Sequence, residues 1–377
     1  MGQYGWNVVH GLARTGALSA ITVLAQQAPD AKAAPLADDL PPGLVRTRRT
    51  WSRDDWLAGA RLARQVRAER PDVVWFNLGY TVFGASRPVN FLGLLAPLLA
   101  RRLGLPLVIT LHQIFEATPP SSIGAKNGRL TAMGARAATH LLLRAGAVCV
   151  TLGRYKTALQ LHYPGRGSVH HIPHGSYVSP ELLPHPATPP EDILFFGSLA
   201  PFKGVPVLLE AYERLKRHRP QASLTIAGSD HPRFPGYRDS LRGAVLARNG
   251  AGPGGVRWLG ALPETDLRGL FAQARVVALP YLATTGASSV LYRAAAYGRP
   301  VVASDLTDLR AATAEEQLAL DYVPPSDSAA LAQALEALLA DPARQTAIAK
   351  HNLDAMRKMT LEHTCARYLE LFQQARA

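Results

Sequence analysis

The chain has 377 residues, 47% of them apolar and 18% charged, which is sufficient for about two globular domains. This composition excludes a disordered protein, a collagen-like fibre and a small disulfide scaffold, and the lack of a long apolar run argues against a transmembrane helix or an export signal. The net charge is +13, and residues 1–178 hold nearly all of the excess, with 20 Lys and Arg against 8 Asp and Glu.

The first half of the chain alternates short apolar runs with amphipathic stretches, a rhythm typical of βαβ units and a parallel sheet. It opens with GQYG and a helix over Trp6–Thr15, whereas such a domain normally begins with a strand. We therefore expect the first strand to be missing or to be encoded upstream of Met1. The other strands predicted here are Ile21–Leu24, Val73–Asn77, Leu107–Leu111 and Ala147–Thr151, and the helices are Trp56–Glu69 and Phe91–Leu103.

A linker is predicted over His171–Asp192, which holds six prolines and no periodicity. The second half then repeats the alternation. Its predicted strands are Ile193–Phe196, Leu224–Ala227, Val256–Leu259, Val276–Leu279 and Pro300–Ala303, and its helices are Val205–Arg217, Leu267–Ala274, Ser289–Tyr297 and Ser328–Leu339. We expect domains over residues 1–178 and 179–360. Residues 361–377, with a helical pattern over Leu361–Gln374, are expected to return to the first domain.

The strongest local motif is ILFFGSLAPFKG, in which a buried strand ends at Gly197 and Lys203 precedes a helix. This arrangement places backbone N–H groups, a lysine and a helix N-terminus at the carboxyl end of a strand, where α/β sheets bind ligands, and it suits a phosphate. An ordinary strand–helix loop is the alternative. The spacing matches neither a Walker loop nor a dinucleotide fingerprint.

A second motif, TTGASSVLYRAAAYGRPVVASD, predicts a turn from Gly286 to Ser289 with Ser288 or Ser289 as the helix N-cap. This turn also offers N–H donors to an anion. A capped core helix without a ligand is the alternative.

The order and spacing of four blocks resemble the retaining GT-B glycosyltransferases of the family-four type. The blocks are GQYGWNVVHGLARTG, VITLHQ, IPHG (where the family usually has IPNG) and the series that begins with FFGSLAPFKG and ends with RAAAYGRPVVASDL. Together they span nearly the whole chain. The resemblance implies two Rossmann-like domains that face each other across a cleft, with residues 1–178 on the acceptor side and residues 179–360 binding a nucleotide sugar.

The resemblance also implies roles for single residues. His112 matches the histidine near the transferred sugar. Donor diphosphate binding is implied for Gly197, Lys203, Gly286, Ser288 and Ser289, contact with the base for Gly260, Ala261 and Leu262, and a place in the cleft for Gly2, Gly5 and His174. Arg293 stands where the family's acid binds the ribose, and we expect it to turn toward a donor phosphate instead. Glu116, four residues after His112, is expected to point into the cleft as an acid, with an ordinary loop carboxylate as the alternative. No metal and no cofactor is implied, because side chains and helix dipoles stabilise the leaving diphosphate.

The chain departs from the family at its paired acids and at one cation. The Glu-x7-Glu positions hold Thr285 and Arg293, and the arginine before the family's lysine is replaced by Ser198. We therefore keep two hypotheses. The first is a retaining hexosyltransferase of polysaccharide biosynthesis that uses a lipid-linked or glycan acceptor. The second is a degenerate GT-B protein that binds a nucleotide sugar or a partner without turnover.

The charge of the first half suggests an anionic neighbour, and we expect peripheral contact with the inner face of an anionic membrane. A nucleic-acid partner is not expected, because no recognition motif is present and Trp51, Trp56, Trp75 and Phe76 are predicted to be core aromatics. A cytoplasmic location is favoured by the two isolated cysteines. His162, His170 and His171 fit no metal spacing.

Overall fold

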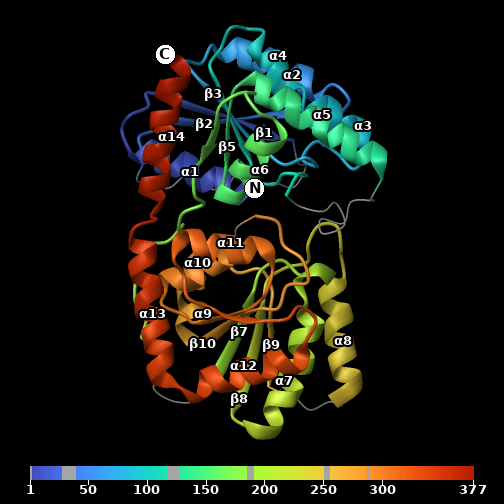
Figure 1. Cartoon of the computed structure of the whole chain (residues 1–377), viewed down its shortest axis with the longest axis vertical. Helices are drawn as coiled ribbons and strands as arrows, with labels where there is room; N and C mark the ends of the chain where they lie inside the picture. Colours follow the sequence, from blue (N-terminus) through green and yellow to red (C-terminus); the bar gives the residue numbers. More distant parts are fainter. Residues whose placement is uncertain (1, 28–39, 118–127, 185–190, 250–254, 287) are drawn as a thin grey trace. The chain divides into compact units, whose positions relative to one another are not determined.

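The protein consists of two compact units in a computed structural model that describes residues 2–27, 40–117, 128–184, 191–249, 255–286 and 288–377 (Figure 1). Unit 1 comprises residues 1–175 together with residues 361–377, and unit 2 comprises residues 176–360. The chain therefore passes from unit 1 into unit 2 once and returns for its last helix.

Unit 1 contains a four-stranded parallel sheet of order β3-β4-β5-β6 and a separate parallel pair, β1-β2. Its strands are β1 (Ile21–Gln26), β2 (Val45–Trp51), β3 (Val74–Leu78), β4 (Leu107–Leu111), β5 (Ala147–Val150) and β6 (Val169–His171). Its helices are α1 (Gly2–Arg14), α2 (Ala58–Glu69), α3 (Arg87–Gly93), α4 (Ala96–Arg101), α5 (Arg129–Ala145), α6 (Gly153–His162) and α14 (Leu361–Arg376). Every residue of β4 is buried, as expected of a central strand covered on both faces.

Three sequence predictions for unit 1 are wrong in detail. The helix expected over Phe91–Leu103 is two helices, α3 and α4. A Cβ on Gly93 would lie 2.1 Å from the Phe83 ring, so the chain packs closely there just before the break. GQYG forms the first turn of α1 rather than a turn after a strand. Trp56, predicted to be in the core, is 59% exposed.

Unit 2 is a six-stranded parallel sheet of order β12-β11-β10-β7-β8-β9. Its strands are β7 (Glu191–Phe196), β8 (Ala222–Ala227), β9 (Val256–Leu259), β10 (Ala274–Leu279), β11 (Val301–Ser304) and β12 (Asp321–Val323). Its helices are α7 (Val205–His218), α8 (Tyr237–Asn249), α9 (Glu264–Gln273), α10 (Ser289–Ala296), α11 (Thr307–Glu316), α12 (Ser328–Ala340) and α13 (Pro342–Arg357), with a 3₁₀ turn, η2, over Pro201–Lys203.

The strand order of unit 2 fixes where a ligand can bind. Counted from β7, the order is 3-2-1-4-5-6, which is the doubly wound Rossmann arrangement. Its connections reverse direction between β7 and β10. In such sheets the crevice outside the carboxyl ends of the strands at this reversal is the ligand site. The loops that follow β7 and β10 therefore border the expected ligand site.

Candidate functional site

Three neighbouring strands of unit 2 lead into glycines at one edge of the sheet. Gly197 follows β7 with a φ of +138°, and Gly228 follows β8 with a φ of +139°, a conformation that residues with a Cβ rarely adopt. A Cβ on Gly228 would lie 1.9 Å from the carbonyl oxygen of Gly197. The Gly228 N–H also donates to the carbonyl oxygens of Leu259 and Gly260. Gly228 therefore lets the loops after β7 and β8 pack against each other, whereas a Cβ on Gly197 would meet only the Val290 side chain, at 3.8 Å, which leaves the main chain at Gly197 open to the close approach of a ligand.

Lys203 ends the η2 turn, two residues before α7 begins at Val205. Its Nζ is 3.7 Å from the centre of the buried Tyr281 ring, a cation–π contact between the loops after β7 and β10. The two loops are also in backbone contact, because a Cβ on Gly204 would lie 1.8 Å from the carbonyl oxygen of Pro280. Lys203 is thus held beside the reversal point of the sheet.

The turn before α10 lies next to Gly197. Val290, in the first turn of α10, would be 3.8 Å from a Cβ on Gly197. Gly286 has a φ of +72°, and its N–H donates to Asp308 Oδ2 at 2.8 Å. Ser288 occupies the N-cap position, as predicted, but its side chain makes no capping hydrogen bond, and Ser289 is exposed. The N–H groups in the first turn of α10 are therefore not capped by the side chain of Ser288.

Arg293 forms an ion pair within unit 2. Its Nη2 lies 2.6 Å from Oε1 of Glu264, the first residue of α9, and the arginine side chain is only 9% exposed. Glu264 is well placed there, because a carboxylate at a helix N-terminus is stabilised by the helix dipole. The structure thus gives Arg293 an acidic partner, and its contact with a phosphate stays a prediction.

The segment expected to contact a nucleotide base joins β9 to α9. Gly260 and Leu262 are half-buried in it and Ala261 is exposed. A Cβ on Gly260 would lie 3.3 Å from Arg238 Nη1, so a side chain here would displace that guanidinium. This segment is next to the glycine edge formed by Gly197, but no described contact distinguishes one base from another.

In unit 1, His112 is the first residue after β4 and is held from two sides. Its backbone N–H donates to the Leu78 carbonyl oxygen at 3.2 Å, and the Nε2 of its ring lies 2.5 Å from Asn77 Oδ1. The Tyr4 ring meets the imidazole edge-on at 4.8 Å between centres. Burial lowers the pKa of His112 well below its usual value, and nearby His174 lowers it further. The ring is therefore neutral at pH 7, with Nε2–H donating to Asn77 and Nδ1 left as an acceptor.

The glycines of the first turns of α1 have different surroundings. A Cβ on Gly5 would lie 2.8 Å from Asn77 Nδ2, so Gly5 lets α1 approach the amide that holds His112. Gly2 has no neighbour within 4 Å of such a Cβ. Of the two glycines predicted to line a cleft, only Gly5 lies in the surroundings of His112.

His174, which replaces the asparagine of the usual IPNG motif, is also buried in unit 1. Its ring centre lies 5.1 Å from that of Tyr4, and its Nδ1 is 3.1 Å from the Gly175 carbonyl oxygen. Burial lowers the pKa of His174 to about 4. Tyr4 therefore packs against two neutral histidines, His112 and His174.

A buried hydroxyl network that the sequence did not reveal extends from Tyr4 into the core of unit 1. The Tyr4 and Tyr368 hydroxyls are 2.8 Å apart, and Tyr368 is 2.8 Å from Thr110 Oγ1. Thr110 also accepts from Trp75 Nε1 at 2.8 Å and lies 2.9 Å from Cys149 Sγ. The one sequence signal was a threonine inside the apolar run of β4. Tyr368 comes from α14, which lies beside α1 (Figure 1).

Glu116 follows His112 by four residues and does not contact it in any described interaction. The Tyr163 hydroxyl donates to Glu116 Oε1. Glu116 Oε2 is buried and has no hydrogen-bond partner in the part of the chain that the structure describes. Burial and the charge of Glu116 raise the pKa of Tyr80. Glu116 therefore belongs to a second polar group of unit 1, separate from the surroundings of His112.

Among the described residues, no three His, Cys, Asp or Glu side chains are grouped so that they could hold a metal ion. Over the same residues, no helix is both long enough and apolar enough to cross a bilayer.

Curated relatives match part of the chain. Glycogen synthase from Mycobacterium tuberculosis is 33% identical over 159 residues, which are 42% of this chain and 36% of that protein. Phosphatidyl-myo-inositol mannosyltransferase from Mycobacterium leprae is 28% identical over 208 residues, 54% of this chain and 52% of that protein. The chain thus spans about a third to a half of the length of the curated relatives it matches.

Solved structures match more of the fold. Sucrose-phosphate synthase from Thermosynechococcus elongatus has a TM-score of 0.73 at 20% identity, covering 98% of this chain and 92% of its own. HepE from Anabaena, in complex with UDP-glucose, has a TM-score of 0.64 at 19% identity, covering 86% of each chain. These neighbours establish a GT-B fold with two Rossmann-like domains, as the sequence predicted.

Two family models match successive parts of the chain. The model described as Glycosyltransferase Family 4 matches residues 1–176, and the model described as Glycosyl transferases group 1 matches residues 190–341. The two matches follow one another in the order that the sequence motifs predicted. The chain therefore belongs to the family-four, group 1 glycosyltransferases.

Proposed function

We propose that this protein transfers a hexose from a nucleoside diphosphate sugar to a glycan or lipid-linked acceptor, with retention of the anomeric configuration. The observation that carries the proposal is the backbone edge at Gly197 and Gly228, with Lys203 beside it, at the reversal point of the unit 2 sheet. HepE, a neighbour of the same fold, is described in complex with UDP-glucose, and this supports a nucleotide sugar as the donor.

The proposed chemistry places growing negative charge on the donor diphosphate. The bond from the sugar C1 to the phosphate oxygen breaks, a bond from C1 to the acceptor oxygen forms, and the acceptor proton passes to the departing phosphate. Lys203 and the N–H groups of the first turn of α10, at Ser288 and Ser289, would stabilise that charge, which requires donors fixed before the reaction begins. The Gly197 N–H donates to the Ala227 carbonyl oxygen and the Gly286 N–H to Asp308, so these two glycines would contribute a close approach to the main chain rather than hydrogen bonds to the phosphates.

His112 is proposed to contact the transferred sugar. Its neutral state supports this role, because a neutral imidazole can accept a hydrogen bond from a sugar hydroxyl through Nδ1 while Asn77 keeps Nε2 occupied. Tyr4 and His174 would keep the ring in this orientation.

We place the protein at the cytoplasmic face of an anionic membrane. The excess positive charge of residues 1–178 supports peripheral contact with such a surface. Cys149 and Cys365 are both buried and unpaired, which suits a reducing compartment. The lipid-linked class of acceptor is supported by the mannosyltransferase relative, whose name describes an acceptor of that kind.

The test is turnover of labelled donors by the purified full-length protein. UDP-glucose, UDP-galactose, GDP-mannose and their relatives are incubated with it in the presence of EDTA, and release of the nucleoside diphosphate is measured. His112→Ala should lower turnover at least tenfold, whereas His162→Ala, an exposed histidine on α6, should leave it unchanged. The anomeric configuration of the product is read by NMR.

The results separate the two hypotheses. Turnover with a retained anomer supports the proposed reaction. Binding of a nucleotide sugar without release of diphosphate from any donor would instead identify a degenerate GT-B protein. Absence of binding of every nucleoside diphosphate and nucleotide sugar would refute the transferase and the nucleotide-sugar-binding form of the second hypothesis.

A further inference from the structure

Unit 1 carries a strongly basic layer of helices that the proposed reaction does not use. The layer consists of α2, α3, α4 and α5, which lie on one side of unit 1 (Figure 1). In this layer α2 contacts α3 and α4, and α5 contacts the same two helices. Together these helices contain eight arginines, all of them exposed, and a single acidic residue, Glu69. We call this layer the arginine face.

Large apolar side chains are exposed at one end of the arginine face. Trp56 and Leu57, directly before α2, are 59% and 58% exposed, and Leu92 of α3 is 38% exposed. The two positions are adjacent, because a Cβ on Gly59 in α2 would lie 2.9 Å from the Leu92 carbonyl oxygen. Leu130 and Met133 of α5 are exposed as well, at 75% and 66%, so the arginine face combines basic and large apolar side chains. Asp55, next to Trp56, forms an ion pair with Arg61 at 3.0 Å.

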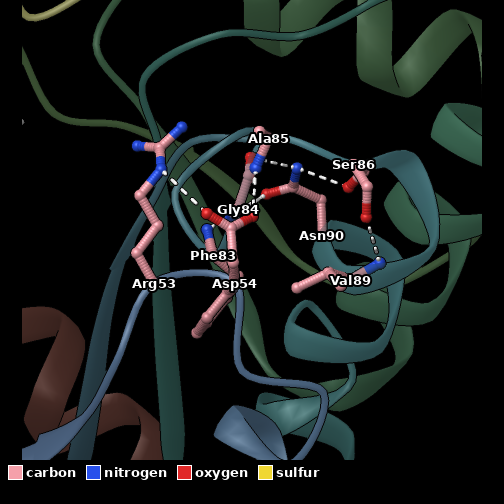
Figure 2. Close-up of polar contacts among 8 residues, drawn as sticks. All are labelled: Arg53, Asp54, Phe83, Gly84, Ala85, Ser86, Val89 and Asn90. Carbon is pink, nitrogen blue, oxygen red and sulfur yellow. Dashed lines mark hydrogen bonds and ion pairs between the residues drawn. The ribbon is translucent and has the colours of Figure 1, made fainter.

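The segment that presents Trp56 is held in place by a hydrogen-bonded turn (Figure 2). Asp54 has a φ of +63°, its N–H donates to the Phe83 carbonyl oxygen at 2.8 Å, and its Oδ1 accepts from the Ala85 N–H at 2.6 Å. The buried Asn90 side chain accepts from the N–H groups of Phe83 and Gly84 and donates to the Gly84 carbonyl oxygen. Because the turn is fixed from several sides, little conformational entropy is lost when its apolar end binds a partner.

We propose that the arginine face, together with Trp56, Leu57 and Leu92, docks on an anionic lipid surface. Each exposed arginine near such a surface contributes about 1 kcal/mol, and tryptophan favours the headgroup level, where one part of its ring is apolar and the N–H is solvated. The inference deepens the membrane contact proposed above and rests on it.

Two other occupants fit the surface less well. Exposed leucines at the end of a basic surface add nothing to contact with a nucleic-acid backbone, and Trp56, the one large aromatic that the described part of this surface exposes, offers no series of stacking platforms. A second copy of the chain would bring eight arginines against eight arginines across a twofold axis, which repel.

The first experiment locates Trp56 in the bilayer. Full-length protein is mixed with vesicles of 70% phosphatidylcholine and 30% phosphatidylserine, with brominated acyl chains that quench tryptophan at short range. We expect quenching in the natural protein and its loss in Trp56→Phe, which keeps an apolar ring but removes one of the five tryptophans. Equal quenching in both proteins would show that a different surface enters the bilayer, and would overturn the proposal.

The second experiment measures vesicle binding by sedimentation. Removing two exposed charges in Arg64→Gln/Arg67→Gln should weaken binding about 25-fold, roughly fivefold for each arginine. Trp56→Ser/Leu57→Ser should weaken it at least tenfold. Leu161→Ser is the matched control, because Leu161 is 75% exposed on α6, outside the arginine face, and should not change binding.

These measurements distinguish failure of this inference from failure of the proposed reaction. Binding that is equal for neutral and anionic vesicles, or unchanged in both double variants, refutes the arginine face as the docking surface. Release of diphosphate from a donor in free solution is measured without vesicles. It therefore tests the transferase activity independently of any membrane.

Discussion

Lys203 offers the sharpest test of the nucleotide site, because Ser198 leaves it as the one cation of the ILFFGSLAPFKG motif. In the structure its ammonium group lies 3.7 Å from the centre of the Tyr281 ring, a contact worth about 0.5–2 kcal/mol, so the lysine is positioned before a ligand arrives. A charge-assisted hydrogen bond to a phosphate is worth about 1.5–3 kcal/mol. Lys203→Ala should therefore raise the Kd for UDP or GDP roughly tenfold to a hundredfold.

Isothermal titration calorimetry with UDP and GDP measures this change. Lys216→Ala is the matched control, because Lys216 lies on α7, the helix that follows Lys203, but its Nζ binds the Ala222 carbonyl oxygen at the opposite, amino end of β8. Arg293→Ala and the double variant Lys203→Ala/Arg293→Ala show whether the arginine also binds the diphosphate. Losses that are strongly non-additive would indicate that both cations act on one diphosphate. An unchanged Kd in Lys203→Ala would refute the reasoning.

Three further predictions concern stability, each measured by chemical denaturation. Burial raises the pKa of Glu316 from 4.5 to about 8, so between these pH values the folded state keeps a proton that the unfolded state loses. The contribution of this group to stability is therefore complete below pH 4.5 and is lost as the pH rises toward 8, and the free energy of unfolding should be lower by about 3 kcal/mol at pH 7. Glu316→Gln, which can still accept the Tyr292 hydroxyl, should remove this decline, and parallel pH curves would contradict it. Gly204→Ala should cost at least about 2 kcal/mol, since φ is +67° and a carbonyl oxygen occupies the Cβ position. Gly243→Ala in the open middle of α8 is its control and should be neutral or stabilising. Tyr368→Phe removes the central hydroxyl of the buried network and should cost about 1–3 kcal/mol, so an unchanged free energy of unfolding would mean that the network is not stabilising.

The strands of both units were predictable where the sheet is covered on both faces. Leu107–Leu111 was predicted with its observed bounds, because a central parallel strand is an uninterrupted apolar run. β2 was missed for the opposite reason: its sequence VRTRRTW is polar, and most of its residues are exposed in a two-stranded sheet. Trp56 was misplaced because hydrophobicity alone cannot distinguish a core aromatic from an exposed one.

The candidate site was predictable only in its local parts. Gly197 and Lys203 could be proposed because their chemistry lies within one strand–turn–helix segment. The partner of Arg293 was not found, since Glu264 is 29 residues away and the ion pair depends on how α9 and α10 pack. The role of Tyr368 could not be predicted, because its contact with Thr110 joins residues that are 258 positions apart in the sequence.

That distance has a consequence for how the protein is made. A ribosome adds about 5–20 residues per second, so roughly 13–50 seconds separate the emergence of Thr110 from that of Tyr368. During this interval all of unit 2 emerges, while α14 has not yet packed on unit 1. Trp75, Thr110 and Cys149 are therefore without the Tyr368 side chain that contacts them in the folded protein. The unit synthesised first is therefore the last to be finished, and the nascent chain depends on its early half staying unaggregated until the final helix arrives.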